Sequence, residues 1–195
     1  MKTVVCFVSR PHGFSIVDAL VNSPKYKILK IFTHSLNPKS QDPTRSQRTD
    51  FQKFVQICQK NCIPLEKIDE KNQSISDVPQ CDFIVEVSWR YLIGEEITNK
   101  ANIVAFGIHR GKLPEYAGAQ PIKQALENNE KNIVLSAHYL DSEIDQGTVI
   151  DSISHPVNYI NTHTLDENIR RLRDEITELF PKLMFNVFKF FNNSS

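Results

Sequence analysis

Net charge of either sign is missing from this chain of 195 residues. Its 23 basic and 23 acidic side chains cancel, and the pI calculated from the sequence is about 7.0. A surface without excess positive charge does not gather nucleic-acid phosphates or anionic lipids by long-range attraction. We therefore expect no nucleic-acid partner.

Long hydrophobic runs are also missing. No apolar segment approaches the roughly 20 residues that cross a bilayer as a helix. The apolar run at residues 3–9 is too short, and too soon interrupted by polar residues, to make a convincing secretory signal. We expect no membrane association and a cytoplasmic location.

Cysteine is scarce, with four residues in the chain. Cys6 and Cys81 lie in apolar, strand-like runs, whereas Cys58 and Cys62 are four positions apart on a predicted helix. That spacing places two thiols on one helix face, but no second Cys/His pair follows at the spacing of a metal site. We expect free thiols and no bound metal.

Glycine-rich phosphate loops are absent from a chain that has six glycines. The stretch "SRPHGFS" at residues 9–15 follows the first apolar run and contains one glycine. It matches neither G-x-G-x-x-G nor G-x-x-x-x-G-K-[ST], and the nucleophile-elbow motif G-x-S-x-G does not occur either. These absences argue against classical dinucleotide binding and Walker-type phosphate binding.

The sequence does contain an alternation of short apolar runs, which predict strands, and amphipathic segments, which predict helices. Strands separated by helices need crossover connections, and these imply parallel pairing. We predict a single α/β domain over residues 1–195, with a mostly parallel central sheet, flanking helices and a long C-terminal amphipathic helix that bends before Pro181. The predicted strands cover residues 3–9, 26–34, 63–68, 81–89, 102–109, 132–140 and 147–157, and the predicted helices cover residues 14–22, 48–61, 92–100, 119–130 and 162–191.

Polar side chains follow several predicted strands, where ligands bind in open α/β sheets. His109 is the best-placed general acid, base or oxyanion stabiliser, because an imidazole carries either charge state near neutral pH; a satisfied structural histidine is the alternative. Asp145 is a candidate to orient it, although Asp-x-Gly is also common turn chemistry. The polar residues near such strand ends are His12, His34, Trp89, Arg90, His109, Arg110 and Asp145.

Four stretches follow one another in an informative order: "GIH" at 107–109, "KLPEYAGAQPI" at 112–122, "VLSAHYLD" at 134–141 and "IDQGTVI" at 144–150. Together they resemble the folate-dependent formyltransferase family, and most closely its nucleotide-sugar N-formyltransferases. The resemblance implies the Rossmann-like fold of the formyl transferase N-terminal domain. It also implies transfer of a formyl group from N10-formyltetrahydrofolate to an amine.

Within this resemblance, His109 matches the catalytic histidine and Asp145 the catalytic aspartate. A protonated His109 would stabilise the oxyanion of the tetrahedral intermediate, while Asp145 holds the imidazolium and helps remove the amine proton. Gly107 stands where the family has an asparagine, and losing one such oxyanion donor typically costs about 10²–10³ in kcat. Three explanations of Gly107 stay open. Arg110 or a backbone N–H serves as a substitute donor, the enzyme is slow, or the domain binds its ligand without catalysis.

The resemblance also implies residues that hold the formyl donor and the acceptor, without a metal. The matching segment of the family folds around the pterin, often through backbone groups. Instead of binding a ligand, the aromatic candidates could simply pack at a strand end, and the basic candidates could be ordinary solvated loop residues. The cofactor-binding candidates are Trp89, Arg90, Tyr91, Leu92, His138 and Asp141, and the substrate-binding candidates are Arg10, His12, Arg110 and Lys112.

The acceptor is expected to be a small-molecule amine. Methionyl-tRNA formyltransferases carry a C-terminal β-barrel domain that we do not expect here, and glycinamide ribonucleotide enzymes usually bear a glycine-rich loop that "SRPHGFS" lacks. We therefore expect an amino sugar on a nucleotide carrier, with phosphoribosylglycinamide as the alternative acceptor. A catalytically silent folate- or nucleotide-binding module is the alternative from another class. The C-terminal helix has surplus apolar surface at Phe185, Phe188, Phe190 and Phe191, for which packing on the sheet and a contact in a homodimer are the two alternatives.

Overall fold

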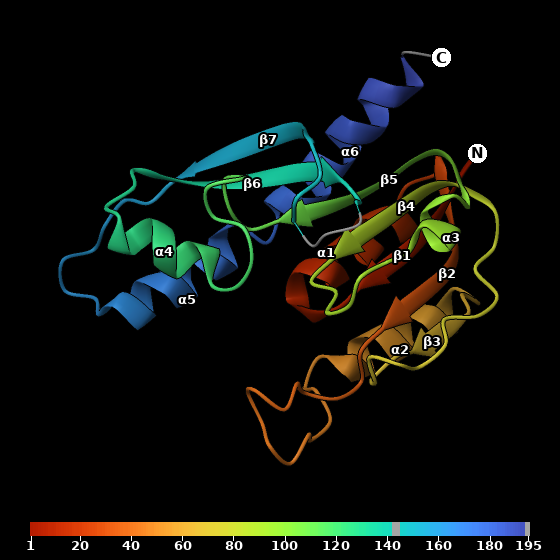
Figure 1. Cartoon of the computed structure of the whole chain (residues 1–195), viewed down its shortest axis with the longest axis horizontal. Helices are drawn as coiled ribbons and strands as arrows, with labels where there is room; N and C mark the ends of the chain where they lie inside the picture. The colour runs from red at the N-terminus through yellow and green to blue at the C-terminus, as the bar shows by residue number, and fades with distance from the viewer. Residues whose placement is uncertain (142–144, 194–195) are drawn as a thin grey trace. The chain divides into compact units, whose positions relative to one another are not determined.

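The computed structural model describes residues 1–141 and 145–193 (Figure 1). The chain divides into two units, Met1–Ala105 and Phe106–Ser195, and each is described by itself. The first unit contains β1 (Lys2–Val8), α1 (Arg10–Val21), β2 (Tyr26–Thr33), α2 (Phe51–Lys60), β3 (Leu65–Lys67), β4 (Cys81–Val87), α3 (Glu95–Thr98) and the start of β5 (Ala101–His109). The second contains the end of β5, α4 (Pro121–Glu127), β6 (Asn132–Tyr139), β7 (Val149–Pro156), α5 (Leu165–Glu175) and α6 (Leu179–Asn192).

Parallel pairing characterises the first unit. β1 pairs in parallel with β2 and with β4, and β2 pairs in parallel with β3. The continuous apolar run from Val4 to Val8 is fully buried, as expected for a parallel strand covered on both faces. Helix α1 packs on β1, β2 and β4, so the β-α-β beginning predicted from the sequence is confirmed.

Antiparallel pairing characterises the second unit. β6 pairs in an antiparallel manner with both β5 and β7, in a register that sets Gly107 opposite His138 and His109 opposite Ser136. The hydrogen-bonded order of the strands is β3-β2-β1-β4-β5-β6-β7. The α/β class with a mostly parallel sheet and flanking helices is therefore confirmed, and β6 and β7 are its antiparallel edge.

The C-terminal segment forms two helices instead of the single bent helix that we predicted. Helix α5 begins after Thr164, whose hydroxyl accepts from the backbone N–H of Glu167 while the Glu167 side chain accepts from the backbone N–H of Thr164. It ends at Glu175, and α6 begins at Leu179. Pro181 lies in the first turn of α6, where its missing N–H costs no intrahelical hydrogen bond, so the break precedes the proline by several residues.

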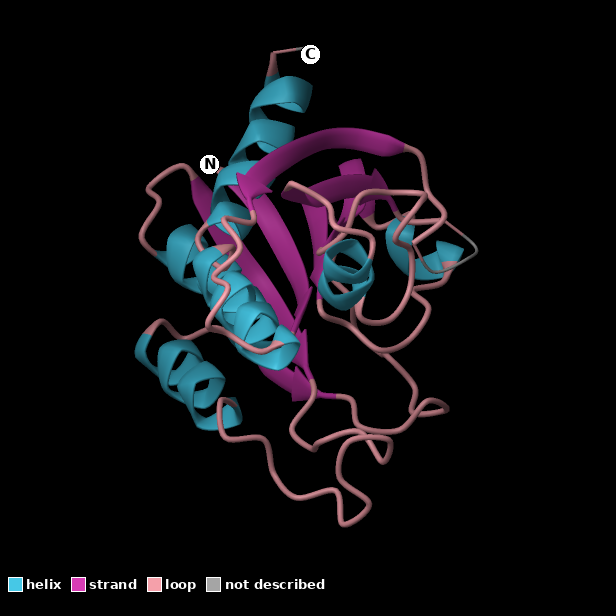
Figure 2. Cartoon of the chain, turned by 90° about the vertical axis from the view of Figure 1, so that its left-hand side faces the viewer, coloured by secondary structure: helices cyan, strands magenta, loops and turns pink. Residues whose placement is uncertain are grey.

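The last turns of α6 account for the surplus apolar surface noted in the sequence. Phe188 is fully buried, and α6 packs on β6 and β7. Phe190 is 57% exposed, close to the end of a helix that extends past these strands in both views (Figures 1 and 2). One aromatic residue of this group therefore remains on the surface.

The described cysteines are free thiols, with Cys6, Cys58 and Cys81 buried and Cys62 exposed. Burial raises the pKa of Cys58 and of Cys81 to about 11. Among the residues that the structure describes, none of the helices combines the length and the apolar character needed to span a membrane.

Gly13 allows α1 to approach β1 closely. A Cβ atom built at this position would lie 2.9 Å from Cβ of Val8 and 3.2 Å from its carbonyl carbon. Real Cβ atoms do not approach other atoms so closely, and the neighbouring backbone belongs to a fully buried strand.

We predict that Gly13→Ala destabilises the protein. Alanine gains about 1 kcal/mol over glycine in an exposed helix, but overpacking against a buried strand costs about 1–3 kcal/mol, so we expect a net loss of about 1 kcal/mol. Urea unfolding measures the change, and Asp18→Ala on the exposed side of α1 is the control that should shift stability by less than about 0.5 kcal/mol. A Gly13→Ala variant that is more stable than the wild type would contradict the close-approach explanation.

Candidate active site

His109 is the last residue of β5, and a hydrogen-bond acceptor lies next to each of its ring nitrogens. Its Nε2 lies 2.7 Å from the carbonyl oxygen of Tyr116, and its Nδ1 lies 3.3 Å from Oδ2 of Asp145. A neutral imidazole carries one N–H, whereas the imidazolium donates to both acceptors. The side chain is 10% exposed, so these two partners fix the orientation of the ring.

The Asp145 carboxylate lies between two histidines. Its Oδ2 faces His109 and also accepts from the backbone N–H of Gly118 at 3.2 Å, while its Oδ1 lies 3.6 Å from Nε2 of His138. The Asp145 side chain is 13% exposed. The structure therefore brings together His109, Asp145 and His138, which the sequence analysis selected from three separate stretches.

A close backbone approach sets the turn that carries Asp145. A Cβ atom built at Gly147 would lie 1.7 Å from the carbonyl oxygen of Tyr139, so no larger residue fits this position with the backbone as it stands. Asp145 itself has φ of 56°, in the left-handed region that aspartate tolerates better than most residues. The Asp-x-Gly pattern thus serves the turn and presents the carboxylate at the same time.

His138 is buried between two acceptors. Its Nδ1 lies 3.0 Å from the carbonyl oxygen of Tyr139, and its Nε2 has no hydrogen-bond partner among the described residues, since 3.6 Å to Asp145 is too long for one. Burial lowers the pKa of His138, although the Asp145 carboxylate opposes this shift. A neutral His138 can donate to only one of its two neighbours.

Gly107 is buried and lies on the same face of the sheet as both histidines. Residues 107 and 109 are two apart in β5, so their side chains share one face of the strand. Gly107 is also the cross-strand partner of His138, and partners in an antiparallel pair point to the same face. An asparagine side chain at position 107 would therefore stand on the face that carries His109 and His138.

Two residues that the sequence analysis did not select hold the loop after β5. The buried Ser136 hydroxyl donates to the carbonyl oxygen of Gly111 at 2.8 Å and accepts from the backbone N–H of Leu113 at 3.2 Å. Tyr116 contributes its carbonyl oxygen to His109, and its hydroxyl donates to Glu130 at 2.7 Å. A serine on a strand and a backbone carbonyl give no pattern that a single sequence reveals.

An aromatic cluster lies in the first unit and contains two of the polar residues found near strand ends. The rings of His34 and Trp89 stack with centroids 4.1 Å apart, and Tyr91 meets His34 edge-on at 5.3 Å. His34 is fully buried; its Nδ1 donates to the carbonyl oxygen of Ile68, and its Nε2 accepts from the backbone N–H of Arg90. This pair of contacts selects the neutral imidazole, and burial lowers the pKa of His34 to about 3.

The cofactor-binding candidates of the first unit are bonded to nearby backbone. The Arg90 guanidinium donates to the carbonyl oxygen of Leu36 at 2.5 Å, and the Tyr91 hydroxyl donates to the carbonyl oxygen of Asp69 at 2.7 Å. Leu92 is 49% exposed. The Trp89 indole N–H is buried and has no hydrogen-bond partner among the described residues.

The other candidates from the sequence occupy varied positions. His12 is buried in α1, and Arg10 donates to the Gln41 side chain at 2.7 Å. Asp141 is exposed. Lys112 pairs with Glu115 at 2.8 Å on the surface, an arrangement that contributes little to stability.

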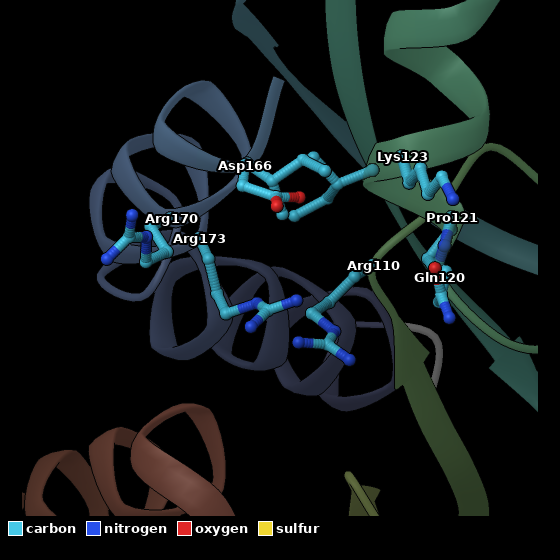
Figure 3. A pocket seen from close by; sticks show the side chains of 9 residues that line it. Arg110, Gln120, Pro121, Lys123, Asp166, Arg170 and Arg173 are labelled. Carbon is cyan, nitrogen blue, oxygen red and sulfur yellow. The ribbon is translucent and has the colours of Figure 1, made fainter. Parts of the chain in front are cut away.

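Arg110 lines a cavity of about 380 Å³ in the second unit, beside Lys123 of α4 and Arg170 and Arg173 of α5 (Figure 3). It also lines a smaller cavity of about 120 Å³ with Lys112 and Tyr116. Within the described ranges, no group of three or more His, Cys, Asp or Glu side chains is arranged to hold a metal ion.

The neutral state of His34 makes stability depend on pH. Because the folded pKa of about 3 lies below the unfolded value near 6.5, the unfolded chain binds more protons between these values, and stability falls as the pH drops below about 6.5. Between pH 7.5 and pH 5, we predict that the wild type loses about 1–2 kcal/mol more stability than His34→Gln does. Urea unfolding of both proteins at both pH values measures the difference. An equal loss in wild type and variant would contradict the assignment.

Comparison with known proteins gives a consistent result. The family model described as "Formyl transferase" matches residues 1–184. A methionyl-tRNA formyltransferase of Limosilactobacillus fermentum is 24% identical over 192 residues, which cover 94% of this chain and 59% of that protein. The chain thus spans about three-fifths of the length of this relative.

Solved structures show the same fold at low sequence identity. A phosphoribosylglycinamide formyltransferase from Brucella melitensis has a TM-score of 0.70 at 16% identity, over 97% of this chain and 95% of that one. A 4-N formyltransferase from Francisella tularensis has a TM-score of 0.64 at 18% identity, over 96% of this chain and 69% of that one. Since the family model covers nearly the whole sequence, the chain belongs to the formyl transferase family.

Proposed function

We propose that this protein transfers a formyl group from N10-formyltetrahydrofolate to a small-molecule amine. The observation that carries the proposal is the arrangement of His109 and Asp145, with Nδ1 and Oδ2 3.3 Å apart at the end of β5, in a chain of the formyl transferase family. Acyl transfer of this kind needs a donor for the oxyanion and a base for the amine proton, and an imidazole paired with a carboxylate supplies both.

We propose that the segment Trp89 to Leu92 of the first unit binds the formyl donor. The half-exposed Leu92 offers apolar surface, and the buried Trp89 indole N–H has no partner among the described residues, so the segment retains a hydrogen-bond donor. The Arg90 and Tyr91 side chains hold the segment in place, because they donate hydrogen bonds to the carbonyl oxygens of Leu36 and Asp69. When bound, the folate supplies an activated formyl carbon and leaves as tetrahydrofolate.

His109 and Asp145 divide the proton transfers between them. The amine nitrogen attacks the formyl carbon, and the carbonyl oxygen becomes an oxyanion to which the imidazolium of His109 donates. The Nε2–H now bonded to the Tyr116 carbonyl is available for this, because a charged oxygen is a stronger acceptor than a neutral carbonyl. Asp145 accepts the amine proton directly or through water. Collapse of the intermediate then breaks the bond from carbon to N10, and the proton taken from the amine passes to N10, so that Asp145 is a carboxylate again.

The acceptor that we propose is an amino sugar on a nucleotide carrier. The balanced charge of the chain supports a small acceptor over tRNA, and the stretch "SRPHGFS" has one glycine where a glycine-rich phosphate loop would have several. Phosphoribosylglycinamide is the second candidate. The cationic cavity beside Arg110 suits a phosphorylated acceptor of either kind.

We predict release of tetrahydrofolate from N10-formyltetrahydrofolate when aminodeoxy nucleotide sugars are supplied one at a time. Glycinamide ribonucleotide and methionyl-tRNA are tested in the same assay. His109→Gln is expected to lower kcat by about 10²–10⁴, because general acid–base catalysis contributes a factor of this size.

His155→Gln is the matched control for this experiment. His155 also pairs with a carboxylate, 2.8 Å from Glu175, but it lies on β7 in contact with α5. This variant should keep the wild-type rate. If the wild type and His109→Gln show the same background turnover with every acceptor, the protein does not catalyse formyl transfer and is a silent binding module.

We predict that Gly107→Asn raises kcat by about 10²-fold, the usual effect of one oxyanion donor. The new amide would stand on the face that carries His109 and His138. Gly107→Leu has a side chain of similar size without a donor and should show no such increase. An appreciable wild-type rate that Gly107→Asn leaves unchanged would mean that another donor already serves the oxyanion.

A further inference from the structure

The cavity beside Arg110 gathers cations from three parts of the second unit. Arg110 follows β5, Lys123 belongs to α4, and Arg170 and Arg173 belong to α5 (Figure 3). Asp166 is the acidic residue of the lining. Lys123 also pairs with Glu127 at 3.8 Å, so the arginines carry most of the positive charge that the cavity offers.

The arginines of α5 differ in what they contact. Arg171 donates to Glu175 at 2.9 Å and to the carbonyl oxygen of Val157 at 2.8 Å, so it holds the fold together. Arg170 and Arg173 are three apart, hence on one helix face, and both are exposed. No ion pair of either is found among the described residues, so their charges are available to a ligand.

Two guanidinium groups converge across the cavity. In Figure 3 the side chains of Arg110 and Arg173 reach toward each other from the end of β5 and from α5. An anion between these two side chains is attracted by both charges. A phosphate group matches the planar fork of arginine and forms two parallel hydrogen bonds with each guanidinium.

The size and walls of the cavity indicate more than a bare ion. Its volume of about 380 Å³ lies within the usual range for small-molecule sites. Pro121, Ile122 and Ile169 add apolar surface to the cationic lining. The lining therefore suits an organic phosphate, with its anionic group on the arginines and its carbon skeleton against the apolar wall.

The cavity also lies next to the proposed catalytic histidine. A Cβ atom built at Gly111 would lie 2.7 Å from Cβ of Pro121, which lines the cavity, and 3.0 Å from Nε2 of His109. The wall of the cavity at Pro121 is therefore close to the His109 ring, and an anion held in the cavity would fix a substrate near the His109 and Asp145 pair.

We propose that this cavity binds the phosphate or diphosphate group of the acceptor amine, with Arg110, Arg170 and Arg173 as its principal ligands. The assignment of the ligand as the acceptor rests on the proposed function. The assignment of the cavity as an organic phosphate site does not, and it is tested without folate.

Calorimetry measures binding of inorganic phosphate, inorganic pyrophosphate and uridine diphosphate to the wild type and to Arg170→Gln/Arg173→Gln. We expect millimolar or tighter binding of pyrophosphate or uridine diphosphate, weakened at least tenfold in the double variant. Tighter binding of the nucleotide than of pyrophosphate identifies a nucleotide carrier, and equal binding identifies a phosphate ester of another kind.

Lys182→Gln is the matched control, since it removes an exposed cation of α6 outside the cavity and should leave binding unchanged. Thermal unfolding checks that the double variant is folded, and Arg173→Lys, which keeps the charge but loses the fork, should bind with intermediate affinity. Absence of binding to the wild type, or equal binding by wild type and double variant, would overturn the site. If anions bind as expected but pyrophosphate does not compete with the acceptor in the formyl-transfer assay, the cavity is not the acceptor site.

Discussion

The carboxylate of Asp145 places one oxygen toward each of two imidazoles, 3.3 Å from Nδ1 of His109 and 3.6 Å from Nε2 of His138. A largely buried carboxylate is costly unless it is paired and hydrogen-bonded. The N–H of Gly118 supplies one hydrogen bond, and the ring nitrogens of His109 and His138 lie next to the two carboxylate oxygens. Burial lowers the pKa of His138, which favours its neutral form. Asp145 thus joins the histidine at the end of β5 to the histidine of β6.

The surrounding backbone keeps these groups in register. The antiparallel pairing of β5 and β6 sets Gly107 opposite His138 and His109 opposite Ser136, and the Ser136 hydroxyl holds the loop that begins at Gly111. Gly147, two residues after Asp145, lets the backbone approach the Tyr139 carbonyl closely. Positions on neighbouring strands and in tight turns place side chains more accurately than long loops do, and catalysis requires such accuracy.

Much of this arrangement could be predicted from the sequence. The apolar run before His109 has the length and composition of a buried strand, and the Asp-x-Gly pattern marks the turn that carries Asp145. The break between α5 and α6 was missed because Ile176 to Glu178 contain no strong helix breaker. The Tyr116 carbonyl and the Ser136 hydroxyl were missed because their partners are backbone groups, which every sequence has. The cluster of Arg110, Arg170 and Arg173 was missed because Arg110 is about 60 positions away from the other two in the sequence and shares a cavity with them only in the folded chain.

The central claim is that His109 and Asp145 act as one catalytic unit. A double-mutant cycle of His109→Ala, Asp145→Ala and the double variant, with kcat/KM for formyl transfer as the readout, tests it most directly. Residues that act as a unit give strongly non-additive losses. The account predicts that the double variant is no more than about threefold slower than the slower single variant. Losses that multiply, as for two independent residues, would contradict it.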